Sequence, residues 1–306
     1  MSPSPVSPAE PLLGAHVFAS GGLAKRAIPY VERIGATTLQ VFVSNPRGWA
    51  LSAGVPAQDE KFAAWAAEHG VPVFVHATLL INLGSNVEAT VEKSVASLRH
   101  AVARGRTIGA RGVVFHAGSS LATERRAEAY GQLREHLLPL LDELAPDDPD
   151  LLVEPTAGGG YALASRVEDL GEYFAAVDGH PRLRVCLDTC HAHAAGHDLA
   201  EPAGLTKTLD ALVDTVGPGR LALVHANDSR DPVGSLRDRH ENLGAGTIGG
   251  DAFEALFTHP AAAGVPILVE TPSQDDGAGH AADIALLRSL ADRCSLAGRH
   301  DGTGQG

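Results

Sequence analysis

The sequence predicts a single α/β domain that closes into a (β/α)8 barrel, on three observations. Eight short apolar runs recur along the 306 residues, and helix-like sequence follows each of them. Strands that alternate with helices are typical of a parallel sheet, and eight such units are the number that closes into a barrel. No break in composition divides the chain, so we expect one domain over residues 12–297.

The eight runs are rich in Val, Leu, Ile and Phe, as expected for strands buried on both faces. In chain order they are AHVFAS (15–20), TLQVFV (38–43), VPVFVHA (71–77), GVVFHAG (112–118), LLVEPT (151–156), LRVCLDT (183–189), LALVHAN (221–227) and PILVET (266–271). The gaps between them carry Ala, Leu, Glu and Arg at helical spacing, as in DEKFAAWAAEHG, ATVEKSVASLRHAVARGRTIGA and AEAYGQLREHLLPLLDELA. We therefore expect each strand to be followed by a helix on the outside of the barrel.

The ends of the chain depart from this pattern. Residues 1–11 are rich in Pro and Ser and residues 298–306 in Gly, and we expect both to be disordered tails. The N-terminal stretch lacks the basic and apolar segments of a secretory signal, and no apolar run approaches the ~20 residues of a membrane span. The cysteines, Cys186, Cys190 and Cys294, show no CxxC spacing, which argues against a disulfide framework and favours a reducing cytoplasm.

Polar residues stand at or near the ends of the last six apolar runs. They are His76, His116, Glu154, Asp188, His225 and Glu270. One such residue alone would be interpreted as an ordinary loop-facing side chain. The carboxyl ends of all the strands in a barrel converge on one mouth, where active sites are built. Six polar ends in succession therefore predict one shared polar site.

Three further residues are expected to join this site. His191 follows Asp188 in LDTCHAHAAGHD, and the charged loop GSLRDRHENLGAG (234–246) supplies Asp238 and His240. The nine residues offer imidazole and carboxylate without thiolate, which suits Zn²⁺, Mn²⁺ or Fe²⁺ better than Ca²⁺ or Mg²⁺. Nine groups exceed one tetrahedral site and suffice for two or three divalent ions. His16, inside the first run, is a candidate to support a ligand, and Cys190 is expected to be a small buried side chain.

The formal net charge of −13 argues against nonspecific phosphate binding by the chain as a whole. It does not exclude a local positive site, because three divalent ions would outweigh the four carboxylates among the nine residues. Sites with several divalent ions serve phosphoryl chemistry, in which one ion generates hydroxide and the others stabilise the phosphate and the leaving oxygen. An anionic substrate is therefore compatible with an acidic chain.

Long motifs in the sequence resemble the endonuclease IV family of zinc-dependent apurinic/apyrimidinic endonucleases. They are GAHVFASGGL, HATLLINLGS, VFHAGS, VEPTAGGG, CLDTCHAHAAGHD, HANDSRDPVGSLRDRHENLGAGTIG and ILVETP, and the similarity covers nearly the whole chain. The resemblance implies a TIM barrel with three zinc ions, a hydrolase of the deoxyribonuclease IV type. Such an enzyme cleaves damaged double-stranded DNA 5′ to an abasic site, leaves a 3′-hydroxyl and serves base-excision repair. We expect a monomer in the cytoplasm, associated with the nucleoid and not with a membrane.

The resemblance also implies how the nine residues share the ions. His76, His116 and Glu154 would hold one ion. Glu154 would bridge to a second ion, held with Asp188, His225 and Glu270. The third would be held by His191, Asp238 and His240. Glu154 and Glu270 are the expected catalytic carboxylates, and Glu270 would also orient or deprotonate the attacking water.

Candidates for DNA contact lie near the predicted mouth: Arg47, Leu79, Leu80, Arg237 and Arg239. Arg47 belongs to NPRGW, which resembles the family loop that enters DNA at the lesion, although Gly48 stands where many relatives carry a longer polar side chain. Leu79 stands where a relative can carry an aromatic residue. Leu79 and Leu80 either enter the base stack or pack under the following helix. Arg237 and Arg239 either meet phosphate or are simply solvated.

Two other functions remain open on the residues alone. A sugar isomerase or epimerase on a related barrel uses a Glu, Asp, His, Glu set much like Glu154, Asp188, His225 and Glu270. Such an enzyme needs only one or two metal ions and leaves the five other ligands unexplained. A non-catalytic protein that binds damaged DNA is the second alternative, and it would not require a complete ligand set. The sequence therefore favours the nuclease.

Overall fold

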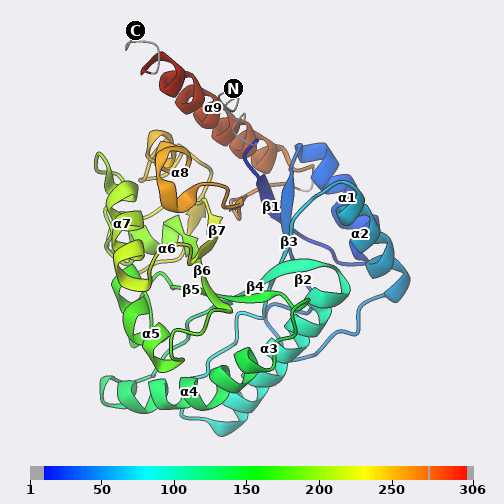
Figure 1. Cartoon of the computed structure of the whole chain (residues 1–306), viewed down its shortest axis with the longest axis vertical. Helices are drawn as coiled ribbons and strands as arrows, with labels where there is room; N and C mark the ends of the chain where they lie inside the picture. The colour runs from blue at the N-terminus through cyan, green and yellow to red at the C-terminus, as the bar shows by residue number, and fades with distance from the viewer. Residues whose placement is uncertain (1–9, 275, 302–306) are drawn as a thin grey trace, which may run out of the picture.

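The computed structural model describes residues 10–274 and 276–301, which form a closed parallel barrel (Figure 1). Its strands are β1 (Leu13–Val17), β2 (Thr38–Phe42), β3 (Val73–His76), β4 (Ala110–His116), β5 (Asp150–Glu154), β6 (Leu183–Asp188), β7 (Leu221–His225) and β10 (Ile267–Val269). Strands β1 to β7 follow chain order around the ring, and β10 closes it between β7 and β1. Every neighbouring pair is parallel, which confirms the predicted fold.

Helices surround the barrel and connect its strands (Figure 1). They are α1 (Leu23–Ile34), α2 (Pro56–Glu68), α3 (Glu88–Thr107), α4 (Arg126–Asp142), α5 (Leu170–Ala176), α6 (Thr189–Ala194), α7 (Gly204–Val216), α8 (Ala255–Thr258) and α9 (Ala278–Asp301). Short 3-10 turns accompany them at η1 (Thr123–Arg125), η2 (Val167–Asp169), η3 (Gly250–Glu254) and η4 (Pro260–Ala262). A short antiparallel pair, β8 (Asp228–Ser229) and β9 (His240–Glu241), lies in the connection after β7 and was not predicted.

Alternate side chains of each strand point into and out of the barrel. Both faces of the strands are buried, one inside the barrel and the other under the helices. The inward side chains form a small apolar cluster, which we call the barrel plug: Phe74, Val114, Leu152, Cys186, Leu223 and Leu268. Outward residues such as Val113 and Phe115 belong to a larger core under the helices. The backbones of β1 and β2 approach closely at Gly14, since a Cβ there would lie 1.8 Å from the carbonyl oxygen of Thr38.

The ends of the domain differ slightly from the prediction. Helix α9 continues to Asp301, beyond residue 297 where we expected the domain to end. It packs against β1 and α1, and its far end extends away from the barrel (Figure 1). Residues 1–9 and 302–306, which make up most of the two expected tails, lie outside the described residues. In the described part of the chain, no helix combines the length and the apolar character that a bilayer crossing requires.

Candidate metal centre

The polar residues at the strand ends lie one layer above the barrel plug. Each plug residue is followed two positions later by one of them, as Phe74 is by His76 and Cys186 by Asp188. Because strand side chains alternate with a period of two, both members of each pair point into the barrel. The spacing of an apolar residue and a polar residue at six strand ends thus places six potential ligands at one mouth.

Glu154 lies at the centre of this layer. It is fully buried at the end of β5, and four imidazoles approach its carboxylate. One oxygen, Oε2, lies 3.2 Å from Nε2 of His76 and 3.6 Å from Nε2 of His116. The other, Oε1, lies 3.1 Å from Nδ1 of His225 and 3.4 Å from Nδ1 of His191. The two oxygens thus face different parts of the site, which is the geometry of a bridging ligand.

Potential ligand atoms gather in sets whose members lie within 4.8 Å of one another. Three of these sets are His76, His116 and Glu154; Glu154, Asp188, His225 and Glu270; and His191, Asp238 and His240. They are the same sets that the resemblance implied. The fold therefore brings all nine of the expected ligands together, although residues as far apart as His76 and Glu270 supply them.

Local structure places His191 in the third set. The Asp188 carboxylate caps α6, because its Oδ1 accepts the backbone N–H of His191 at 2.9 Å. This fixes His191 one turn above the end of β6. Its Nε2 then lies 3.3 Å from Oδ2 of Asp238, and Oδ1 of Asp238 lies 3.0 Å from Nε2 of His240.

A buried carboxylate holds the charged loop that carries Asp238 and His240. Asp228 accepts the backbone N–H groups of Gly244 at 2.9 Å, Gly246 at 3.1 Å and Ile248 at 2.9 Å. Gly246 passes so close that a Cβ there would lie 2.4 Å from Oδ1 of Asp228. The glycines of this loop therefore let the backbone wrap around Asp228, which fixes the loop over the barrel mouth.

Four of the five histidines are oriented by a hydrogen bond on the far side of the ring. His76, His191 and His240 donate Nδ1–H to nearby backbone carbonyls at 2.8, 3.1 and 3.2 Å. His225 donates Nε2–H to Oε1 of Gln40 at 3.1 Å. Each ring thus turns its other nitrogen toward the carboxylates, as metal-binding histidines do. Nε2 of His240 is buried there and makes no well-aligned hydrogen bond with the nearby Asp238 carboxylate, so the donor set fits a bound cation.

The charges of the carboxylates are strongly coupled to the imidazoles. Burial would raise the pKa of Glu154, but His225, His76 and His116 outweigh it and hold the pKa well below its usual value. The pKa of Glu270 is also lowered, because His225 and His16 outweigh the effect of burial. Both carboxylates are therefore ionised at neutral pH. Bound divalent ions would neutralise the negative charge of these carboxylates.

The imidazoles respond in opposite directions. Burial would lower the pKa of His240, but Asp188 and Asp238 outweigh it and raise the pKa to about 9. The pKa of His191 rises well above its usual value for the same reasons. At the outer edge, burial lowers the pKa of His116 to about 4. At neutral pH His191 and His240 therefore hold a proton beside the carboxylates, whereas His116 is neutral.

The nearby cysteines are poorly suited to bind metal. Cys186 and Cys190 are buried, and burial raises the pKa of each thiol to about 12. Both are thiols at neutral pH, whereas a metal ligand must be a thiolate. The nitrogen and oxygen donors are sufficient without them, and that donor set favours zinc, manganese or iron over calcium and magnesium.

Two buried amides that position the ligands were missed in the sequence. Gln40 donates Nε2–H to Oε1 of Glu270 at 2.7 Å while its own oxygen accepts from His225. Asn227 donates Nδ2–H to Oδ2 of Asp188 at 2.7 Å and accepts the Glu270 backbone N–H at 2.8 Å. The available signal was Gln40 itself, since a polar residue inside an apolar run needs a buried partner.

The ligand sets open into a cavity of about 800 Å³ at the carboxyl ends of the strands. Arg47 and Leu79 line this cavity. Leu79 and Leu80 are 39% and 37% exposed, so neither is buried under the following helix. Arg239, in contrast, pairs with Asp231, with Nε at 2.6 Å from Oδ2. Nη1 of Arg237 lies 3.6 Å from the same carboxylate.

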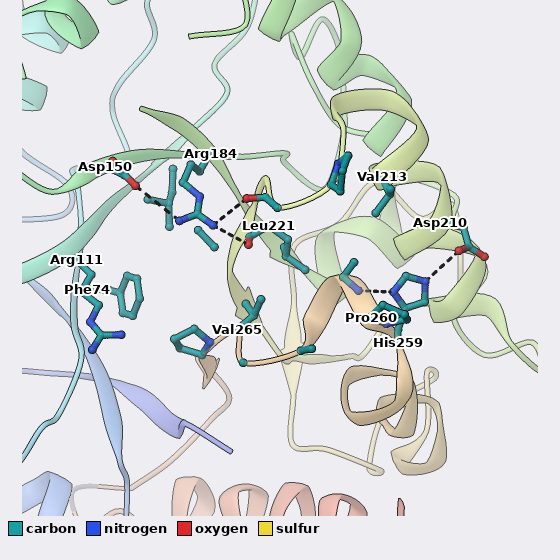
Figure 2. A pocket seen from close by; sticks show the side chains of 18 of the residues that line it. Phe74, Arg111, Asp150, Arg184, Asp210, Val213, Leu221, His259, Pro260 and Val265 are labelled. Atoms are coloured by element: carbon teal, nitrogen blue, oxygen red, sulfur yellow. Dashed lines mark hydrogen bonds and ion pairs between the residues drawn. The ribbon is translucent and has the colours of Figure 1, made fainter. Parts of the chain in front are cut away.

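A cavity of about 630 Å³ lies at the opposite end of the barrel (Figure 2). Residues at the starts of strands line it, among them Asp150 and Leu221. Several of its charged groups are held by the surrounding chain (Figure 2). Arg184 donates to the carbonyls of Gly219 and Leu221, and His259 contacts Asp210 at 3.0 Å. This end of such a barrel typically serves stability, so we place the functional site at the other end.

Comparison with known proteins identifies the family of the chain. Residues 28–290 match the family described as xylose isomerase-like TIM barrel. Over 281 residues the chain is 58% identical to a protein named probable endonuclease 4 from Streptomyces avermitilis, covering 92% of this chain and 90% of that protein. The crystal structure of endonuclease IV from Thermus thermophilus matches with a TM-score of 0.77 and 36% identity, covering 92% of this chain and 100% of that chain. The chain belongs to the endonuclease IV family.

The endonuclease IV family shares its barrel with enzymes that act on sugars. A structure of L-ribulose 3-epimerase matches with a TM-score of 0.69 but is 18% identical, which shows the fold alone. The alternative of a sugar isomerase therefore has the barrel and the Glu154, Asp188, His225 and Glu270 set in its favour, but it does not explain the five other ligands. The resemblance found in the sequence motifs is confirmed.

Proposed function

We propose that the protein is a DNA-repair endonuclease that hydrolyses the phosphodiester bond 5′ to an abasic site in duplex DNA and leaves a 3′-hydroxyl. One observation carries this proposal: nine imidazole and carboxylate ligands converge at one barrel mouth in three overlapping sets. We propose that these sets hold three zinc ions, with Glu154 shared by two of them. Membership in the endonuclease IV family supports the same function.

Divalent ions bound in these sets would supply Lewis acidity toward the phosphate, the attacking water and the leaving oxygen. The protein's own residues fix the geometry and handle the proton. Glu270 is the proposed proton acceptor, and Gln40 holds its Oε1 at 2.7 Å while Nδ1 of His16 lies 3.2 Å away. The lowered pKa keeps Glu270 ionised, so its carboxylate is able to orient a water molecule through a hydrogen bond.

A polyanionic substrate must approach a chain with a net charge of −13. The proposed ions resolve this conflict, because three divalent cations outweigh the four carboxylates of the ligand sets. The positive charge is then confined to the mouth, where the phosphate must lie. The rest of the acidic surface disfavours nonspecific binding of DNA.

We propose that Arg47, Leu79 and Leu80 enter the duplex at the lesion. An abasic sugar has no base to stack, so extruding it costs less than flipping an intact nucleotide. Apolar side chains fill such gaps in other DNA-bending proteins. The exposure of Leu79, which lines the cavity, and of Leu80, which follows it, supports this role over burial under a helix. Gly48 leaves the loop without a longer side chain next to Arg47.

Arg237 and Arg239 are proposed to contact DNA phosphates from the charged loop. Both side chains are exposed, and both lie near Asp231, which neutralises part of their charge. The ion pair also holds their guanidinium groups in place beside the third ligand set. Contacts of this kind position DNA without reading its sequence.

We also propose that a single chain is the working unit, acting on DNA in the cytoplasm in association with the nucleoid. All nine proposed ligands come from one chain, so the site needs no second copy for completion.

The test is a duplex with one tetrahydrofuran abasic analogue, compared with the same duplex intact. We expect a cut immediately 5′ to the analogue and a product that a DNA polymerase extends without further treatment, because its end is a 3′-hydroxyl. Cleavage of both duplexes alike, or a product that polymerase does not extend, would contradict the proposal.

A further inference from the structure

Phe18 is an aromatic side chain with no role in the core. It follows the last residue of β1 and is 80% exposed, more than any other large apolar side chain in the described part of the chain. Its ring meets that of His16 edge-on, with the centroids 6.1 Å apart. An aromatic ring held beside the ligand sets, yet almost fully in water, offers a free face for stacking.

Phe18 stands between two cavities. It lines the cavity of about 800 Å³ that contains the ligand sets and also a neighbouring cavity of about 590 Å³. The second cavity, which we call the side cavity, lies between the loop after β1 and the loop after β2. An ion pair lines it, with Nη1 of Arg104 2.7 Å from Oδ2 of the buried Asp59.

The wall of the side cavity is held in shape by its own loop. Asn45 accepts the backbone N–H of Arg47 at 2.9 Å, and Ser44 accepts that of Ser52 at 3.2 Å. These side chains are engaged with the backbone, so they shape the wall more than they offer a specific pattern of hydrogen bonds. A ligand of this cavity would therefore be recognised mainly through the face of Phe18.

Positive charge lines the metal-site cavity next to Phe18. Lys25, Arg26 and Arg47 line the metal-site cavity, and among the described residues none of the three has an ion-pair partner. Arg239, in contrast, is paired with Asp231. Free cations beside an exposed aromatic ring are the combination by which proteins hold unpaired nucleotides, with cations on the phosphates and the ring on a base.

We propose that the side cavity receives a nucleobase of the bound DNA, which leaves the base stack next to the lesion and stacks on Phe18. This inference rests on the proposed function, because the lesion is what loosens the neighbouring bases. Stacking on an aromatic ring is tolerant of sequence, since every base has a π-face. We therefore expect little preference among the four bases at the position that stacks.

The test uses the metal-loaded protein and a duplex with one tetrahydrofuran site, whose 5′ phosphodiester is replaced by a non-hydrolysable methylphosphonate. The fluorescent base 2-aminopurine replaces in turn the base opposite the lesion and the base on each side of it. Phe18→Ala removes the ring and Phe18→Trp keeps an aromatic face. Leu296→Ala, at a 59% exposed position on α9, is the matched control for loss of an exposed apolar side chain.

With the natural protein, we expect 2-aminopurine fluorescence to change on binding at one of these positions. Phe18→Ala should abolish the change and weaken binding by ~5- to 150-fold, the range for loss of one base–aromatic stack. Phe18→Trp should restore both, and Leu296→Ala should alter neither. Melting temperature and metal content should stay the same in all variants, because none of these side chains is in the core.

An unchanged fluorescence signal at every position, or the same signal in Phe18→Ala, would overturn the proposal while leaving the endonuclease function intact. A loss of metal or stability in Phe18→Ala would also overturn it, because the ring would then support the fold. If the natural protein binds the abasic duplex no better than the intact one, the proposed function itself fails and this inference fails with it.

Discussion

Gln40 shows how one buried side chain sets the geometry of two ligands. Its amide connects the far side of the His225 ring with the carboxylate of Glu270, so both groups lose a partner when it is removed. For Gln40→Ala we expect a ~10- to 100-fold loss of activity, the usual effect of removing a group that orients a metal ligand. Most of the loss should lie in kcat and not in KM. The steady-state kinetics of incision measure this.

Gln132→Ala, an amide on α4 that bonds to Ser85 and Arg125, is the matched control, and it should keep normal kinetics. A normal kcat in Gln40→Ala would show that the two ligands hold their places without the amide.

Glu270→Gln tests the proposed proton acceptor. The amide keeps the volume and one ligand oxygen but loses the charge and the basicity. Incision should fall by at least ~10²-fold, as is usual when an acid/base group is removed, while binding of abasic duplex largely survives. Single-turnover incision and a binding titration measure the two effects separately. A rate near that of the natural protein would remove Glu270 from proton transfer.

Among single residues, the potential metal ligands could be predicted from the sequence, whereas the residues that hold those ligands in position could not. His and carboxylate residues at strand ends are visible as polar breaks in apolar runs. Gln40 and Asn227 were not predicted to belong to the site, because their amides were not counted among the metal ligands. Their role depends on which side chains face them across the barrel. Phe18 was not predicted as an exposed residue near the site, because an aromatic residue in an apolar run is normally expected to be buried.

At the scale of elements, the charged loop after β7 depends on Asp228. Its carboxylate accepts hydrogen bonds from several backbone N–H groups, of which that of Ile248 would otherwise be buried without a partner. Asp228→Ala should lower the free energy of unfolding by at least ~2 kcal/mol, since hydrogen bonds to a charged group are lost. It should also release the ion proposed between His191, Asp238 and His240. Urea denaturation and elemental analysis measure both effects.

Asp214→Ala, at an exposed position on α7, is the control and should change neither quantity. Retention of all bound metal by a destabilised Asp228→Ala protein would show that the third ligand set does not depend on the fold of this loop.

The loop between β3 and α3 allows a role in DNA binding to be separated from a role in the core, because it carries both exposed and buried leucines. Leu79 is 39% exposed at the cavity, whereas Leu83 is buried. Leu79→Ala should keep its melting temperature and metal content but bind abasic duplex more weakly. Cleavage of a flexible single-stranded abasic substrate should suffer less, because no base stack has to be opened.

Leu83→Ala should show the opposite behaviour and lose ~2–5 kcal/mol of stability, as core truncations do. Equal losses by Leu79→Ala on duplex and single strand, or a large fall in its stability, would exclude insertion at the lesion.

Elements with a strong period were predictable, and those without one were not. Every predicted apolar run overlaps a barrel strand, and the bounds of the runs and the strands differ by a few residues at the ends. The β8–β9 pair has two residues in each strand, too few for any periodic signal. The four residues of α9 past residue 297 were missed because Gly298 is a poor helix former and the residues after it are polar, so the apolar pattern ends there.

At the scale of the whole molecule, the barrel separates stability from function. The barrel plug fills the interior. At the amino ends of the strands, charged side chains that line the cavity are held by hydrogen bonds to neighbouring residues. The carboxyl ends carry the proposed metal ligands. The period of the strands was enough to predict this division. The choice between a nuclease and a sugar isomerase was not contained in the barrel and depended on the five ligands beyond the Glu, Asp, His, Glu set.

The central claim is that three divalent ions act together in this site. The most direct test is to strip the protein of metal, add zinc in measured equivalents, and follow incision of the tetrahydrofuran duplex on the same samples. We predict that incision rises with added zinc, reaches its plateau at three equivalents per chain, and needs no added Mg²⁺. A plateau at one equivalent, or activity that only excess Mg²⁺ restores, would contradict the three-metal centre.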